Sequence, residues 1–171
     1  MFFKSVHPNA PAQVLLARVY AERWCLRNVV PSMEAPGLAS LACSNLLWLS
    51  SRVLSQVHSA NLRWHYNGFH TAARYQRKGR CIFCDGEGTE DRIEHFVKCA
   101  VVQSVTPAHL KSGNPLRLPA KMFFLFGMNG KHKIAMSLFI FSLYTMQNEM
   151  RHHPDKTDFK LCFKRVAAEV H

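Results

Sequence analysis

The stretch HKIAMSLFIFSLYTMQNEMRHH, residues 132–153, decides the fold class of this 171-residue chain. At 100° per residue, its main polar side chains fall within one arc of about 140°, and most of the remaining surface is apolar. Those polar residues are Ser137, Ser142, Thr145, Asn148 and Glu149. A helix with this distribution is mostly enclosed by other elements, so we expect residues 132–153 to form a core helix.

The other regular patterns along the chain are also helical. Residues 9–31 predict one helix, and a final helix is expected to begin near Asp155 or Asp158 and to reach Val170. Residues 38–64 carry leucines and valines at helical spacing, while the serines among them favour a break within the segment. No alternating strand pattern exceeds a few residues, so we expect a mainly α fold, a multi-helix bundle.

A cysteine-rich segment, CIFCDGEGTEDRIEHFVKC at residues 81–99, interrupts the helical patterns. Cys81 and Cys84 have the C-x2-C spacing that lets a tight turn direct two thiolates at one ion. Gly86 and Gly88 supply the backbone freedom that such a turn needs. The segment therefore predicts one half of a metal site in its first four residues.

The second half of that site is expected on a helix that follows the turn. Thr89 is a good helix cap, and His95 and Cys99 are four residues apart, so they would project from one face of the helix. Ile93 and Val97 lie roughly opposite and would pack on the core. Three sulfurs and one imidazole make a closed tetrahedral set, which predicts one structural Zn²⁺ in a small zinc knuckle of turn plus helix.

Two other interpretations of the cysteines are less favoured. A C-x2-C pair can be a dithiol redox centre, but such a pair normally heads a helix, and the sequence DGEG after Cys84 does not start one. In the second interpretation the cysteines bind no metal and His95 is an exposed helix residue. The turn, the helix cap and the i, i+4 pair would then have to occur together by chance. Zinc is therefore the favoured interpretation.

The remaining cysteines bear on the compartment. Cys25, Cys43 and Cys162 stand alone in apolar, helix-like stretches, where a free thiol is usually a small buried hydrophobic group. This use of cysteine indicates a reducing environment, so we expect an intracellular protein, nuclear or cytoplasmic.

These patterns divide the chain into four parts. They are a helical region at 1–80 with a basic-aromatic segment at 61–80, the zinc knuckle at 81–101, a linker at 102–120, and C-terminal helices at 121–171 that pack on the first region.

The distribution of charge favours a polyanionic partner. The formal net charge is +11, and ten Lys and Arg stand against two acids in residues 1–80, whereas residues 81–100 hold five acids against two cations. Such an excess suits nucleic acid first and an anionic membrane surface second, while a protein that is merely basic is the simpler alternative.

The basic-aromatic segment before the knuckle carries the candidate nucleic-acid-binding residues. They are Arg63, Trp64, Arg74, Tyr75, Arg77, Lys78 and Arg80. Cations neutralise phosphates and aromatic faces stack on unpaired bases, so this mixture suits RNA or single-stranded DNA. In the alternative interpretation, Trp64 and Phe69 are core anchors and the cations form a solvated rim.

No membrane attachment is expected. The most apolar run, residues 134–146, is interrupted by hydroxyl side chains and is shorter than the roughly 20 residues that a membrane span needs. The N-terminal sequence MFFKSVHPNAP lacks the apolar region of a signal peptide.

The pattern Cys81-x2-Cys84, Glu94-His95-x3-Cys99, preceded by a basic-aromatic segment, resembles the zinc-binding region that follows the reverse transcriptase domain in LINE-type (non-LTR) retrotransposon proteins. The resemblance covers residues 65–101, and SLYTMQNEMRHH is more loosely similar to helices found after that region. It implies a helical segment that helps hold template RNA or target DNA, with the four residues in the family's metal-ligand positions.

The chain lacks what a polymerase needs. Polymerases hold two metal ions with paired carboxylates, and the aspartates here, Asp85, Asp91, Asp155 and Asp158, include no adjacent pair. We therefore expect a non-catalytic, zinc-stabilised nucleic-acid-binding module. The alternatives are a zinc-stabilised protein-protein interaction module with a basic surface, and a thiol-redox enzyme that uses Cys81 and Cys84.

Overall fold

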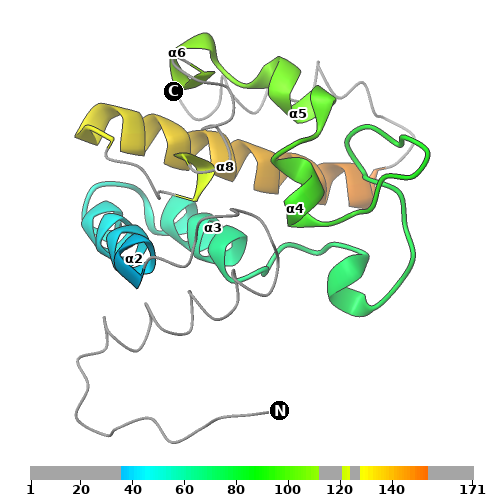
Figure 1. Ribbon diagram of the computed structural model, residues 1–171, viewed down its shortest axis with the longest axis horizontal. Helices are drawn as coiled ribbons and strands as arrows, with labels where there is room; N and C mark the ends of the chain where they lie inside the picture. Colours follow the sequence, from blue (N-terminus) through cyan, green and yellow to red (C-terminus); the bar gives the residue numbers. More distant parts are fainter. Residues whose placement is uncertain (1–35, 112–120, 124–127, 154–171) are drawn as a thin grey trace, which may run out of the picture.

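The computed structural model describes residues 36–111, 121–123 and 128–153, and these residues form helices and loops without a strand (Figure 1). The mainly α fold is thus confirmed. The helices are α2 (Pro36–Ser50), α3 (Ser55–His65), the 3-10 helix η1 (Ala73–Tyr75), α4 (Ile93–Phe96), α5 (Ala100–Val105), α6 (Ala108–Lys111) and α8 (Gly130–His152). The helices predicted at 9–31 and from Asp155 or Asp158 to Val170 lie outside the described residues.

Helix α8 is the core helix, as its sequence predicts, and in the view of Figure 1 it runs between α3 below it and α5 and α6 above it. Met136, Ile140 and Leu143 are fully buried. Ser137 and Ser142, expected on the polar arc, are buried too. Their hydroxyls donate to the carbonyls of the preceding turn, at 2.7 Å and 3.0 Å, so burial leaves neither hydroxyl without a partner.

The break expected within residues 38–64 occurs at residues 51–54, between α2 and α3. Helix α3 then packs along α8. The buried Asn61 amide donates to the Val57 carbonyl at 2.8 Å and to the Ser137 carbonyl of α8 at 3.0 Å. This bond helps to fix the two helices against each other in a largely apolar part of their interface.

The expected linker at 102–120 is helical over part of its length, which corrects the prediction. Helices α5 and α6 occupy residues 100–105 and 108–111, and residues 112–120 lie outside the described part. Val102 and Leu110 explain the difference, because both side chains are buried in the core and hold these short helices on it.

The cysteine-rich segment shares this core. Phe83, Ile93 and Phe96 are buried in the same cluster as Trp64 of α3 and Leu143 of α8. The rings of Phe83 and Phe96 meet edge to face, with centroids 4.7 Å apart. The turn and the helix of the knuckle are thereby joined on the side that faces the bundle.

Candidate metal centre and basic groove

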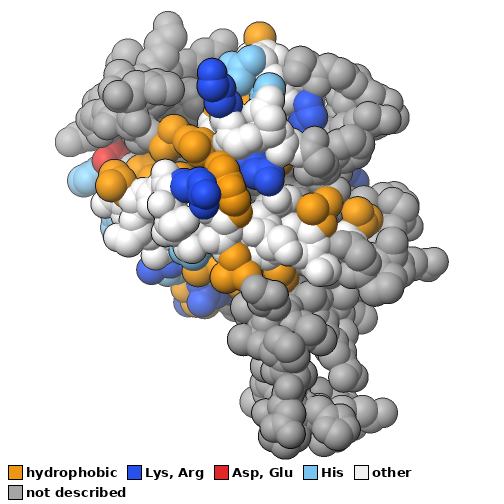
Figure 2. Space-filling model, turned by 90° about the vertical axis from the view of Figure 1, so that its left-hand side faces the viewer, with side chains coloured by type: hydrophobic (Ala, Val, Ile, Leu, Met, Phe, Trp, Pro, Cys, Tyr) orange, Lys and Arg blue, Asp and Glu red, His pale blue; other side chains and the backbone are white. Residues whose placement is uncertain are grey.

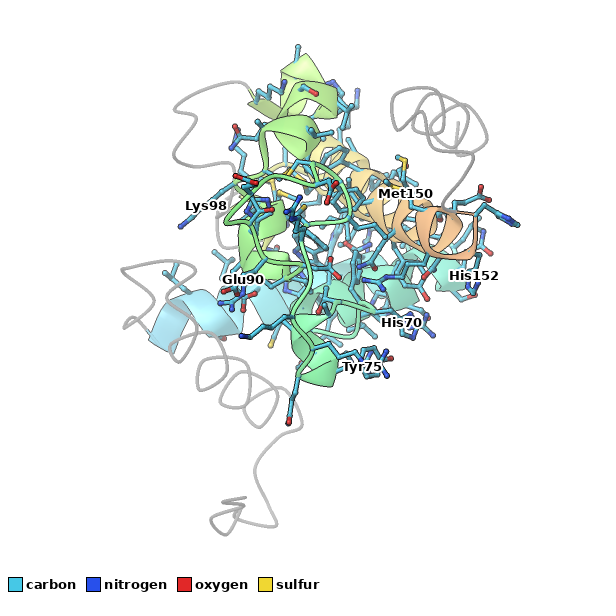
Figure 3. The ribbon with its side chains drawn as sticks, turned by 90° about the vertical axis from the view of Figure 1, so that its right-hand side faces the viewer. His70, Tyr75, Glu90, Lys98, Met150 and His152 are labelled. Atoms are coloured by element: carbon cyan, nitrogen blue, oxygen red, sulfur yellow. The ribbon has the colours of Figure 1, made fainter. Side chains whose placement is uncertain are left out.

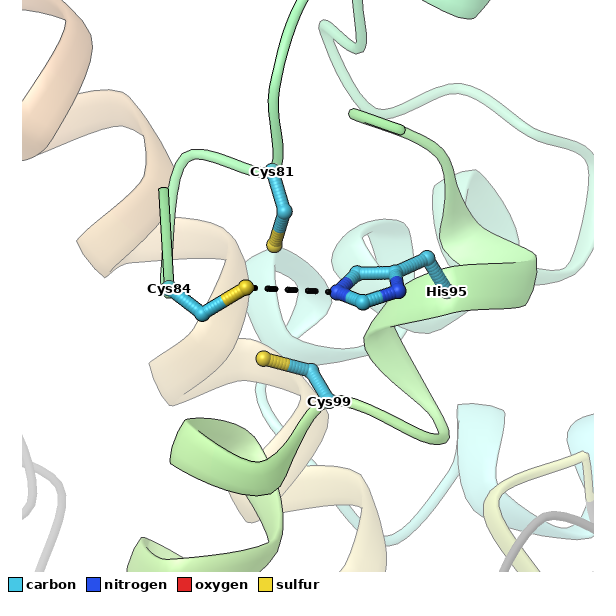
Figure 4. Close-up of side chains that lie close together, drawn as sticks. All are labelled: Cys81, Cys84, His95 and Cys99. Atoms are coloured by element: carbon cyan, nitrogen blue, oxygen red, sulfur yellow. Dashed lines mark hydrogen bonds between the residues drawn. The ribbon is translucent and has the colours of Figure 1, made fainter. Parts of the chain in front are cut away.

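Cys81, Cys84, His95 and Cys99 converge on one point (Figure 4). Their ligand atoms all lie within 4.8 Å of one another, and the Cys84 Sγ lies 3.4 Å from the His95 Nε2. Zinc–sulfur bonds of about 2.3 Å in a tetrahedron separate the sulfurs by about 3.8 Å, so this spacing suits a single tetrahedral ion. The four residues expected from the sequence therefore form a group that can bind one metal ion.

A tight turn brings the first two thiols together. The Asp85 amide donates to the Cys81 carbonyl at 2.8 Å, and Asp85 and Gly88 have positive φ angles of 47° and 71°. Gly86 is needed for space, because a Cβ atom there would lie 3.1 Å from the Thr89 methyl group. The glycines thus serve the turn in two different ways.

Thr89 does not cap a helix, contrary to the sequence prediction, since α4 begins only at Ile93. Its hydroxyl instead donates to the Gly86 carbonyl at 2.6 Å and accepts from the Cys81 amide at 3.3 Å. The hydroxyl therefore stabilises the thiol-bearing turn itself.

His95 and Cys99 do not share one helix face, which corrects a second prediction. Helix α4 ends at Phe96, and Cys99 has an extended backbone at the start of α5, with φ −62° and ψ 123°. The Lys98 amide bonds to the His95 carbonyl at 2.8 Å in the turn between the helices. This turn brings the Cys99 thiol to the ion site. Ile93 and Val97 are buried, as expected.

The Cys81 and Cys99 thiols interact directly with each other. Cys81 and Cys99 share a hydrogen bond, which raises the pKa of the Cys81 thiol with the help of burial and lowers the pKa of the Cys99 thiol. A metal ion binds the thiolate form, so it would replace the shared proton. Among the described residues, Cys43, Cys81, Cys84 and Cys99 are free cysteines.

The basic-aromatic residues expected to form one surface have different surroundings. Trp64 is fully buried, with its ring stacked on Phe123 at 5.6 Å between centroids, so it is a core residue. The Arg63 guanidinium bonds to the Tyr144 hydroxyl and lies 5.1 Å from that ring, which links α3 to α8. These two residues are therefore engaged within the fold.

Arg74 and Tyr75 lie on an exposed turn. The Arg74 side chain donates to the Gly68 carbonyl at 2.7 Å and lies 5.6 Å from the Tyr75 ring. Tyr75 is 51% exposed and nearly parallel to His70, with centroids 6.2 Å apart. Figure 3 shows these two rings beside each other and apart from Glu90. Tyr75 is thus an accessible aromatic ring.

The last three predicted cations line a groove of about 670 Å³. Arg77, Lys78 and Arg80 come from the loop before the knuckle, and Glu90 and Arg92 come from the knuckle itself. Sequence reasoning missed Arg92 as a surface cation of this site, because it lies in the acidic segment. The one signal in the sequence that these cations lie beside the knuckle was the position of residues 77–80 directly before Cys81.

Asp91 joins the two sides of this groove. Its amide donates to the Gly79 carbonyl at 3.0 Å, and its carboxylate oxygen Oδ2 accepts from the Ala72 amide at 2.7 Å and from the Arg151 guanidinium. Asp91 is 3% exposed, so this charge is buried and paired with Arg151. The loop, the knuckle and α8 meet at this single side chain.

A second cluster of cations and an aromatic ring lies at the other end of the molecule and was not predicted. The Trp48 ring has the Arg52 guanidinium 4.3 Å and the Lys133 ammonium 5.1 Å from its centroid. Figure 2, which views this side, shows several Lys and Arg side chains among hydrophobic ones. The aromatic ring stabilises these charges through cation–π contacts.

The chain matches no known protein-family model, and no curated protein or solved structure matches it significantly. Within the described residues, no helix combines the length and the apolar character needed to cross a membrane.

Proposed function

We propose that the chain is a non-catalytic, zinc-stabilised module that binds RNA or single-stranded DNA. The observation that carries this proposal is the groove, in which a wall of the metal-binding knuckle meets the loop of Arg77, Lys78 and Arg80. The ion would stabilise the surface and take no part in chemistry. The formal net charge of +11 supports a polyanionic partner.

The ligand set supports zinc as the ion. Three sulfurs and one imidazole are soft and borderline donors, which suit Zn²⁺ better than the oxygen-seeking Mg²⁺ or Ca²⁺. All four tetrahedral positions would be filled by side chains, which is typical of a structural site and leaves no position for a substrate.

The exposed aromatic ring supports a single-stranded partner. Tyr75 offers its face for stacking, and a base stacked on an aromatic ring contributes about 1–3 kcal/mol. The sequence resemblance to the region after the polymerase of LINE-type retrotransposon proteins points to the same partner. The isolated cysteines favour a reducing, nuclear or cytoplasmic location, which we include in the proposal.

Retention on immobilised single-stranded RNA and DNA tests the proposal. We expect the parent protein to bind at low salt and to be released steeply as salt rises, because binding displaces counterions. The double variant Arg77→Ala/Lys78→Ala should elute at lower salt on every sequence. The control Arg52→Ala/Lys133→Ala removes the same charge at the distant Trp48 cluster and should elute close to the parent.

The same columns address the protein-interaction alternative, which the cations of the groove also favour. Retention of the parent on an acidic polypeptide, with none on RNA or DNA, would replace the proposed partner with an acidic protein. Equal elution of both double variants would show that the groove is not the binding surface.

A further inference from the structure

The acidic side chain of Glu90 lines the groove beside its cations. Glu90 forms an ion pair with Arg92, and the two side chains are 58% and 46% exposed. An exposed pair of this kind contributes at most about 1 kcal/mol, so a stronger anion can displace the carboxylate from Arg92. The guanidinium is held in the groove while remaining open to exchange.

The two walls of the groove keep a fixed separation. Asp91 receives the Ala73 amide on its carbonyl at 3.2 Å and donates its own amide to Gly79 at 3.0 Å. Its side-chain charge is paired with Arg151, so it does not repel an incoming anion. The cations of the loop and Arg92 of the knuckle therefore line the same space without rearrangement of the backbone.

We infer that this groove is a phosphodiester subsite, in which Arg92 exchanges the Glu90 carboxylate for a backbone phosphate that Arg77, Lys78 and Arg80 also neutralise. The inference rests on the proposed function and names the contact that the partner makes. Three of the four cations are arginines, whose planar forks bind phosphate oxygens in pairs. The volume of about 670 Å³ is in the range of small-ligand sites and admits a nucleotide unit.

Fluorescence anisotropy of labelled oligothymidylate and oligouridylate, titrated with the metal-loaded protein, tests the inference. Arg92→Ala should weaken binding about tenfold at low salt, because a charge-assisted hydrogen bond to phosphate is lost. The slope of log affinity against log salt should fall by about 0.7, the value of one phosphate contact on a single strand.

Lys98→Ala is the matched control. Lys98 is an exposed cation of the same knuckle that does not line the groove (Figure 3). Its loss should leave the affinity within about twofold of the parent, since exposed charges away from the contact are screened by salt. Metal analysis of each variant confirms that the knuckle is intact.

Glu90→Gln provides a test of opposite sign. Removal of the competing carboxylate should tighten binding several-fold, a result that a merely structural Glu90–Arg92 pair would not give. A parent that binds, with Arg92→Ala and Glu90→Gln both behaving as Lys98→Ala does, would overturn the subsite and leave the proposed function standing. A parent that binds neither oligonucleotide would overturn both, and binding of oligoglutamate alone would assign the groove to acidic peptides.

Discussion

Each of the four candidate metal ligands should be required for metal binding, because three remaining donors leave the tetrahedron open. We expect one zinc per chain in the parent and a loss of most of it in Cys81→Ser and in His95→Ala. His95→Cys should retain the ion, since four thiolates are also a structural zinc set. Metal analysis of the purified proteins measures this.

Cys43→Ser is the control for this series. Cys43 is a buried thiol of α2 outside the metal group, so its substitution should lower stability without changing the metal content. Equal zinc in the parent and in His95→Ala would contradict the four-ligand site.

His65 should make stability depend on pH. Burial lowers the pKa of this histidine from 6.5 to about 3, so the folded protein keeps it neutral. Above pH 6.5 it is neutral in both states and contributes no pH dependence. As the pH falls from 6.5 toward 3, only the unfolded chain takes up the proton, so this group alone lowers the free energy of unfolding by up to about 1.4 kcal/mol per pH unit.

Urea unfolding at several values between pH 7.5 and pH 5 measures this effect in the parent and in His65→Phe, which keeps a ring against Phe123. Acid also releases metal from thiolates, but that contribution is common to both proteins and cancels in their difference. The variant should lose less stability per pH unit. Parallel curves for the two proteins would show that His65 is protonated in the fold.

At the scale of elements, local pattern predicted the helices whose burial follows from their own sequence. The apolar surface of α8 was visible in residues 132–153, and the break between α2 and α3 was visible in residues 38–64. The structure of the knuckle differs from the prediction, because the sequence EDRIEHFVKC has the local character of one continuous helix. In the fold, a turn at Lys98 separates α4 from α5 and brings the Cys99 thiol to the site, a long-range requirement that helix propensity does not contain.

The turn between α3 and η1 should depend on the absence of a side chain at Gly68. A Cβ atom there would lie 2.9 Å from the Arg63 Cα and Cβ atoms. The Arg63 Cα atom belongs to the backbone of α3 and cannot easily move away, so we expect Gly68→Ala to destabilise the protein by about 1–3 kcal/mol. Thermal and urea unfolding would measure the loss.

Gly88→Asn is the comparison for this element. Gly88 has a φ of 71°, and a Cβ atom there would meet no other atom within 4 Å, so the strain is conformational and asparagine tolerates it. Its cost should be well below that of Gly68→Ala. A similar cost at both sites would mean that the close approach at Gly68 is relieved by a small shift of α3.

At the scale of the whole molecule, composition indicated a basic surface but not its shape. Spacing in the sequence could not separate Trp64, which is buried against Phe123, from Tyr75, which is exposed. Nor could it bring Arg92 to the loop before the knuckle, because that approach is made by backbone bonds between Asp91 and residues 73 and 79. Surfaces assembled from separate segments follow from tertiary contacts, which charge counts do not encode.

The shared core predicts that metal removal affects the entire described fold. Phe83, Ile93 and Phe96 of the knuckle pack with Trp64 and the residues of α8, so loosening the knuckle exposes apolar surface of the bundle as well. A ligand that binds only the folded state stabilises it by about 4 kcal/mol when present at a thousand times its dissociation constant. We therefore expect a chelator to lower the urea midpoint of a single cooperative transition followed by circular dichroism.

Cys81→Ser separates this effect from a direct action of the chelator. The variant should unfold near the midpoint of the chelated parent and should not respond further to the chelator, because its site is already incomplete. Restoring zinc should return the parent, and not the variant, to the higher midpoint. A urea midpoint of the parent that stays constant through chelation would mean that hydrophobic packing of Phe83, Ile93 and Phe96 holds the knuckle without an ion. Metal binding by the three cysteines and the histidine of the knuckle would then not be required for the stability of the fold.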